Sequence, residues 1–206
     1  MILPGGLEER RALGPDWGGW LDRLPALTTA LIEEWELVAD GEAMHGFVSL
    51  VLPVRTRDGG EAVLKVSFDG DEESEHEALA LQTWQGNGTV RLLRADPRRR
   101  ALLLERLLAE DLSDQWDVQA CEVVGELYGR LHVPAPPQLR TVTSYVERWT
   151  AALQALPRNA PVPRRLVEQA TTSARLSAAT RPAPDASSTV TCTTPTCWPP
   201  TASRGW

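Results

Sequence analysis

Lys65 and the glutamates that follow it are the residues whose types and spacing could do chemistry. Lys65 lies within the otherwise apolar run "AVLKVSF", and Glu73, Glu75 and Glu77 follow in the next acidic segment. A lysine that points into a protein interior is costly unless a carboxylate pairs with it. A strand lysine paired with a glutamate of the next helix can present its ammonium group to the phosphates of a nucleotide.

The alternative for Lys65 is a solvent-facing lysine on the outer face of an edge strand, where lysine is common. The acidic helix that follows favours the inward pair. Glu77 is the preferred partner because it lies one helical turn before Leu81, with Glu73 and Glu75 as alternates. We therefore expect the Lys65 ammonium group to approach Glu77.

The elements that would position this pair can be predicted from local patterns. Trp20–Leu37 has leucines at helical spacing, with Pro25 expected in the first turn. Two apolar, β-branched runs, Phe47–Arg55 and Glu61–Phe68, flank the turn "TRDGG" and predict a β-hairpin. The acidic segment "DGDEESEHEALALQTWQGNG" predicts a helix that starts with acids and ends in glycines.

The rest of the chain predicts two more strands and then helices only. "VRLLRAD" and "ALLLERL" are predicted strands that flank the turn "DPRRR". Leu112–His132 is predicted to form a helix with Asp114 near its cap. "VTSYVERWTAALQAL" and "PVPRRLVEQATTSAR" are two further helices. This order predicts an α+β protein with a small antiparallel sheet lobe followed by a helical lobe.

The composition is that of an ordinary globular protein. The 206 residues are 42% hydrophobic and 24% charged, and the net charge of −7 argues against a non-specific nucleic-acid surface. We find no signal peptide, no membrane span and, with three cysteines, no disulfide framework. These observations predict a cytoplasmic monomer without nucleic-acid or membrane partners.

Taken together, "FVSLVLPV", "AVLKVSFDGDEESEHEALALQTW", "TVRLLRAD" and "ALLLERL" resemble the aminoglycoside and hydroxyurea phosphotransferases, and among them the streptomycin 6-kinase type. The resemblance covers about Leu7 to Ala170. It implies a bilobal, protein-kinase-like fold, ATP with Mg²⁺ as cofactors, and phosphoryl transfer to a hydroxyl group of an aminoglycoside-type antibiotic or to hydroxyurea.

The resemblance also implies a set of nucleotide-binding residues. Lys65 matches the strand lysine that holds the ATP phosphates, and Glu77 matches its helical partner. Glu105, Arg106 and Leu107 would lie along the adenine edge, in the hinge after "LLLE". Relatives have a Gly- or Ser-rich phosphate loop where this chain has "GEAMHGFVS", with only Gly46 near the bend.

The catalytic and metal-binding residues of such an enzyme have no match in the printed sequence. The resemblance implies an "HGDLHxxN" loop and a later "DP" motif after the last helices, and neither follows them here. Permitted codons for Ser187–Pro200, read two bases later, encode V-H-G-D-L-H-Y-A-N-V-L-A-A. We therefore infer a change of reading frame between about Ala170 and Ala178. The alternative is an unrelated, disordered tail rich in Thr, Ser and Pro.

These inferences predict three segments: a nucleotide-binding N-lobe over 1–108, an incomplete helical C-lobe over 109–175 and an aberrant, disordered tail over 176–206, irregular from Ser177 onward. The expected function is that of a phosphotransferase lineage whose present chain, without catalytic or metal-binding residues, is inactive. Two alternatives are a non-catalytic nucleotide-binding or interaction module and a non-functional product of a damaged gene.

Overall fold

The structure, a computed structural model, describes residues 2–108, 112–157 and 159–179. Contacts divide these residues into two compact units, 2–127 and 128–179. The first unit contains all the strands, and the second is helical. We describe each unit by itself.

A six-stranded antiparallel sheet organises the first unit, in the order β1-β3-β4-β6-β5, with β2 also beside β3. The strands are β1 (Val38–Ala39), β2 (Met44–His45), β3 (Ser49–Arg55), β4 (Glu61–Ser67), β5 (Leu92–Asp96) and β6 (Ala101–Glu105). Both predicted hairpins are confirmed, β3 with β4 and β5 with β6. The strands β1 and β2 were not predicted.

The first helices begin earlier in the chain than the leucine spacing indicated. The chain starts with the short helix α1 (Gly5–Glu8) and a 3-10 turn, η1 (Glu9–Leu13), before the long helix α2 (Pro15–Glu34). Pro15 occupies the first turn of α2, so our placement of Pro25 there was wrong. Pro25 instead lies in the helix interior, where proline removes a hydrogen-bond donor.

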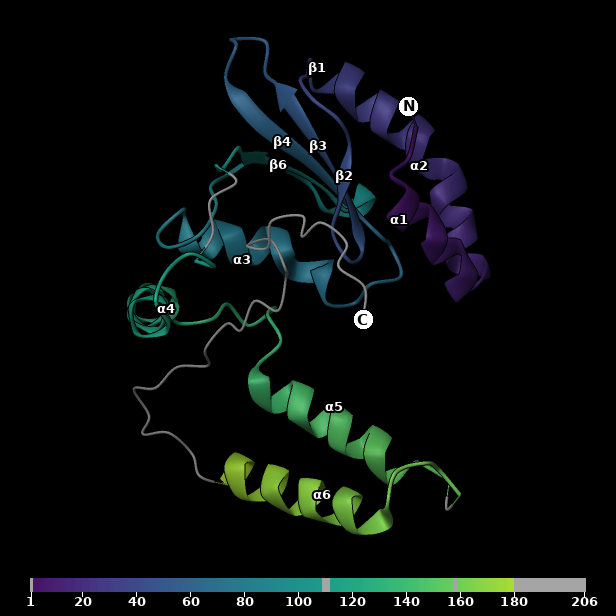
Figure 1. The fold of residues 1–206 in the computed structure, drawn as a ribbon, viewed down its shortest axis with the longest axis vertical. Coiled ribbons are helices and arrows are strands. Elements are labelled where there is room, and N and C mark those ends of the chain that lie inside the picture. Colours follow the sequence, from purple (N-terminus) through teal and green to yellow (C-terminus); the bar gives the residue numbers. More distant parts are fainter. Residues whose placement is uncertain (1, 109–111, 158, 180–206) are drawn as a thin grey trace. The chain divides into compact units, whose positions relative to one another are not determined.

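The sheet has two different faces because side chains alternate along each strand. One face packs against α2 and forms the main core (Figure 1), with Leu24 and Leu31 of α2 and Leu64 of β4 each 0% exposed. The opposite face carries Lys65, which lies between Leu64 and Val66 in β4 and therefore points away from α2. The helix α3 (Glu77–Trp84) lies on this second face, after the 3-10 turn η2 (Ser74–His76).

A third 3-10 turn, η3 (Pro97–Arg99), connects β5 to β6, as the "DPRRR" turn predicted. The Asp96 carboxylate accepts a hydrogen bond from the Arg99 backbone N–H at 3.1 Å, which caps this turn.

The remaining helices are α4 (Asp117–Leu131), α5 (Val142–Gln154) and α6 (Arg164–Ala179). The helix α4 begins at Asp117 rather than Leu112, so Asp114 lies before the helix instead of at its cap. Thr141 caps α5 by accepting a hydrogen bond from the Ser144 N–H at 3.2 Å. Within 128–179, Leu139, Val167 and Thr171 are buried.

The end of α6 corrects one boundary of the predicted tail. We expected no regular structure from Ser177 onward, but α6 continues to Ala179 because the leucine and alanine pattern extends that far. The rest of the predicted tail, 180–206, lies outside the described residues. Within the described parts of the chain, no helix combines the length and the apolar character that crossing a bilayer requires.

Candidate nucleotide site

Lys65 occupies the middle of the sheet and not an edge. Its strand, β4, lies between β3 and β6, and Lys65 is directly opposite Val51 on one side and Leu102 on the other. The residue is only 5% exposed. These observations exclude the alternative of a solvent-facing lysine on an edge strand.

The predicted ion pair is confirmed. The Lys65 Nζ atom donates hydrogen bonds to both carboxylate oxygens of Glu77, at 2.7 Å to Oε1 and 2.9 Å to Oε2. Glu77 is 3% exposed, so both members of the pair are buried. The alternates Glu73 and Glu75 are both exposed. The first choice of partner was therefore correct.

The turn before α3 explains why Glu77 points at the sheet. The Asp71 carboxylate accepts a hydrogen bond from the Ser74 N–H at 2.9 Å, which starts the turn η2 directly before the helix. Glu77 is the first residue of α3 and shares its buried face with Ala80, Leu81 and Trp84. Its carboxylate is thus held beneath β4 by the packing of the whole helix.

The pair leaves one hydrogen-bond donor of Lys65 for an external group. An ammonium group carries three N–H donors, and two of them are directed at Glu77. Among the described residues Lys65 has no further hydrogen-bond partner. A phosphate oxygen is the acceptor that an ammonium group held in this way suits, so the geometry fits the phosphates of a nucleotide.

Gly46 lies in the turn that joins β2 to β3, next to the strand that pairs with β4. The Gly46 N–H donates to the Ser49 carbonyl at 2.9 Å, and the Phe68 N–H donates to the Val48 carbonyl at 2.8 Å. A Cβ atom on Gly46 would lie 2.9 Å from the Ser49 Oγ atom, so the turn packs tightly here. The hairpin thereby places Gly46 at the end of the sheet where Ser49 pairs with Ser67, two positions beyond Lys65.

Glu105, Arg106 and Leu107 were expected to act together along a nucleotide edge, but their side chains have different surroundings. Glu105, at the end of β6, accepts a hydrogen bond from the Arg91 N–H at 2.7 Å. The Arg106 side chain reaches to Asp40, and Leu107 is exposed. The sequence resemblance gave no signal for the Arg106 contact.

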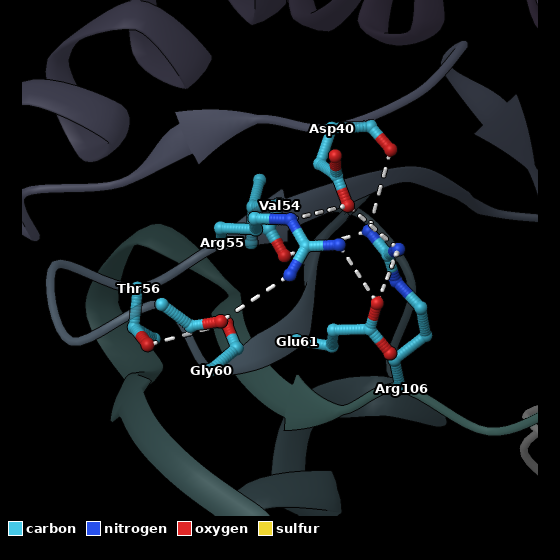
Figure 2. Close-up of polar contacts among 8 residues, drawn as sticks. Asp40, Val54, Arg55, Thr56, Gly60, Glu61 and Arg106 are labelled. Carbon is cyan, nitrogen blue, oxygen red and sulfur yellow. Dashed lines mark hydrogen bonds and ion pairs between the residues drawn. The ribbon is translucent and has the colours of Figure 1, made fainter.

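Figure 2 shows the polar network that holds Arg106. Its guanidinium group donates to the Asp40 carboxylate at 2.9 Å and to the Val54 carbonyl at 3.4 Å. Arg55 adds a second contact to Asp40 at 3.1 Å and one to Glu61 at 2.8 Å. The hydrogen bond from Arg106, together with that from Arg55, lowers the pKa of Asp40 below its ordinary value. The network joins the end of β6 to β1, β3 and β4.

Two residues that sequence reasoning missed complete the face around Lys65. Val51 is directly opposite Lys65, and Val63 precedes it by two positions, so both share its face. Both are half-buried, unlike the fully buried residues of the α2 face. Counting every second residue from Lys65 would have found Val63, whereas Val51 lies on β3 and required the register of the hairpin. These half-buried valines place apolar side chains beside the Lys65 ammonium group.

The described residues do not offer a ligand set for a metal ion. In 2–108, 112–157 and 159–179 no cluster of three or more His, Cys, Asp or Glu side chains could hold one. Hard cations such as Mg²⁺ need several oxygen ligands. We therefore derive no step through a metal ion from this part of the chain.

A small antiparallel sheet with a buried strand lysine paired to a glutamate of the next helix is the sheet lobe of a protein-kinase-like fold. Within that class the chain belongs to the aminoglycoside/hydroxyurea antibiotic resistance kinase family, whose model matches residues 34–181. The resemblance inferred from the sequence is thus confirmed at the level of the family.

Several proteins with kinase or phosphotransferase names are similar to this chain over about two thirds of its length. A streptomycin 6-kinase of Streptomyces glaucescens is 46% identical over 133 residues, 63% of this chain and 43% of the relative. One from Streptomyces griseus is 41% identical over 143 residues, 67% of this chain and 46% of the relative. A hydroxyurea phosphotransferase of Kitasatospora aureofaciens is 44% identical over 126 residues, 59% of this chain and 37% of the relative. The chain spans less than half the length of these relatives.

Proposed function

We propose that this chain binds ATP through the face of the sheet that carries Lys65. The buried pair of Lys65 and Glu77 is the observation that carries the proposal, because it holds in place an ammonium group with one N–H donor that Glu77 does not use. Gly46 in the β2–β3 turn would lie near the phosphates, and Glu105, Arg106 and Leu107 would lie near the base. Family membership supports this assignment, since kinases use ATP.

Phosphoryl transfer to a hydroxyl group of an aminoglycoside-type antibiotic such as streptomycin, or to hydroxyurea, is the reaction that we propose for the lineage. The names of the relatives support both acceptor classes. The family's own description supports an antibiotic-resistance role.

The chain itself we propose to be inactive in this reaction. The printed 206 residues contain no H-G-D-x-x-x-x-N motif, so they lack the aspartate that would accept the proton of the acceptor. Positioning and charge stabilisation supply nearly all catalysis of phosphoryl transfer, and both depend on that loop. The family match ends at residue 181, ahead of Ser187–Pro200, where the shifted frame would encode the motif.

Nucleotide binding can be tested by titrating the chain with a fluorescent ATP analogue. We expect binding by the wild type and a loss of roughly tenfold or more in the double variant Lys65→Met/Glu77→Leu, because a charge-assisted hydrogen bond to phosphate is lost. Replacing both members avoids leaving one charge buried after the ion pair between Lys65 and Glu77 is lost. Arg98→Gln, in the exposed turn between β5 and β6, is the control for removing a positive charge. Equal binding by the double variant and the wild type would reject the site.

A further inference from the structure

The N-terminal segment Gly5–Leu13, made of α1 and η1, contacts the turn between β2 and β3. The Arg10 guanidinium carbon lies 4.3 Å from the centre of the Phe47 ring, a cation–π distance. Phe47 follows Gly46 in that turn and is 62% exposed even with this contact. The Arg10 Nε atom is buried and has no hydrogen-bond partner in the described part of the chain, so the ring is the contact that accounts for its position.

A second contact joins the same two segments. Gly6 lies against the His45 ring so closely that a Cβ atom there would be 2.5 Å from Nε2. The His45 Nδ1 atom is 3.0 Å from the Gly46 carbonyl oxygen and must be the donor, because a carbonyl oxygen only accepts. The histidine ring is therefore held between α1 and the turn that Gly46 begins.

The N-terminal segment is itself firmly anchored, so it can act as a support. Leu7 of α1 is 0% exposed within the core beneath the sheet. Arg11 of η1 donates to the Asp22 carboxylate of α2 at 2.9 Å. By contrast, β2 has only two residues, Met44 and His45, and a two-residue strand gives the turn little support of its own.

We propose that Gly5–Leu13 is a clamp that holds the β2–β3 turn in place, with Arg10 as a positioning residue acting through Phe47. The clamp lies before residues 34–181, which the family model matches. Its consequence for ligand binding rests on the proposed function. The β2–β3 turn leads directly into β3, which pairs Ser49 with Ser67 and Val51 with Lys65. A movement of the turn therefore changes the surroundings of the Lys65 ammonium group.

The clamp can be tested without any ligand, by amide hydrogen exchange followed by NMR. The amides of Gly46 and Phe68 close the turn through their bonds to the Ser49 and Val48 carbonyls. We expect Arg10→Gln to speed exchange at both amides by about two- to fivefold, the size of an exposed cation–π contact. Arg10→Lys keeps the charge and should exchange as the wild type does.

Matched variants separate the clamp from a general loss of stability. Phe47→Leu should behave as Arg10→Gln does, and Phe47→Tyr as the wild type, because only tyrosine keeps the ring. Arg57→Gln removes an exposed ion pair with Glu36 at the opposite end of β3 and should leave both amides unchanged. Unchanged exchange in both Arg10→Gln and Phe47→Leu would overturn the clamp. Equal acceleration of exchange by Arg57→Gln would also overturn it, and so would exchange in Arg10→Lys as fast as in Arg10→Gln.

Titration with the fluorescent ATP analogue distinguishes this proposal from the one on which it rests. Arg10→Gln should weaken binding by at most the same two- to fivefold as it speeds exchange, because affinity falls only with the fraction of molecules whose turn is closed. Weaker binding without faster exchange would mean that Arg10 contacts the nucleotide directly, which contradicts the clamp. No binding by the wild type would reject the proposed function, and the exchange measurements would then decide the clamp alone.

Discussion

At the scale of single residues, Lys65 and Glu77 remove two charges from water and depend on each other. Lys65→Met removes the ammonium group from the buried Glu77 carboxylate, and Glu77→Gln removes the carboxylate from the buried ammonium group. We expect each single variant to lower the free energy of unfolding by about 3–5 kcal/mol. The double variant Lys65→Met/Glu77→Leu should recover most of that loss. Urea denaturation at neutral pH measures the free energy of unfolding of all three variants. A loss below about 1 kcal/mol in each single variant would mean that the ion pair is exposed to solvent and not buried.

A second residue-scale prediction concerns pH and Asp40. Hydrogen bonds from Arg106 and then Arg55 lower the pKa of Asp40 in the folded state. A lowered pKa means that Asp40 stabilises the fold above the pKa of the unfolded chain, about 3.9, and that this stability is lost as the pH falls through the folded pKa. Asp40→Asn should therefore be less stable than the wild type at neutral pH, and the difference should shrink in acid.

Denaturation of both proteins between neutral pH and acid checks this. Asp114→Asn, at an exposed position before α4, is the control for placing an amide on the surface. If the difference in free energy of unfolding between wild type and Asp40→Asn stayed constant with pH, the contact with Arg106 would not depend on the ionised carboxylate.

The two ion pairs differ in how far the sequence could predict them. Lys65 and Glu77 lie 12 residues apart in consecutive elements, so an apolar strand followed by an acidic helix was enough to connect them. Arg106 and Asp40 lie 66 residues apart. Their contact reaches across β3 and β4, which the sheet order places between β1 and β6, and no local pattern records that order.

At the scale of elements, Pro25 is the feature of α2 that conflicts with its local structure. A proline inside a helix leaves the carbonyl one turn earlier without its donor and costs about 3 kcal/mol. The Thr28 and Thr29 hydroxyls donate to the carbonyls of Leu24 and Pro25 at 2.8 and 2.9 Å, but neither reaches the carbonyl of Leu21. We expect Pro25→Ala to raise the melting temperature.

Pro15 provides the matched control for this prediction. It lies in the first turn of the same helix, where proline costs nothing and its fixed backbone angle favours helix initiation. Pro15→Ala should therefore leave the melting temperature unchanged or lower it slightly. Equal increases from both substitutions would mean that the gain comes from alanine in general and not from restoring the hydrogen bond inside α2.

Among the elements, long apolar runs were predictable and short or irregular ones were not. β3, β4 and β6 each show three or more consecutive apolar residues and β5 begins with two leucines, so their hairpins could be found from the sequence. β1 and β2 have two residues each, too few for any periodicity, and form only because β3 offers them a partner. The start of α2 was missed because glycines and a proline precede its leucines.

At the scale of the whole molecule, residues outside the family match supply the helices that pack against one face of the sheet. The match begins at residue 34, yet Leu7, Trp20 and Leu24 belong to the core against the sheet. Buried leucines of this kind contribute about 2–5 kcal/mol each when compared with alanine. The side of the sheet that faces α2 therefore depends on the N-terminal helices, and the side that faces α3 carries the pair of Lys65 and Glu77.

The last prediction concerns activity of the whole chain. We expect no ATP-dependent phosphorylation of streptomycin or hydroxyurea by this chain, because the printed sequence contains no H-G-D-x-x-x-x-N motif that would supply an aspartate to accept the acceptor proton. A form with the reading frame restored ahead of Ser187 should regain "VHGDLHYANV" and with it activity, and sequencing the coding DNA for residues 165–206 establishes where the frame changes. Both forms are assayed side by side with labelled ATP. Equal activity would show that another residue accepts the proton, and an inactive restored form would reject the frame change as the cause.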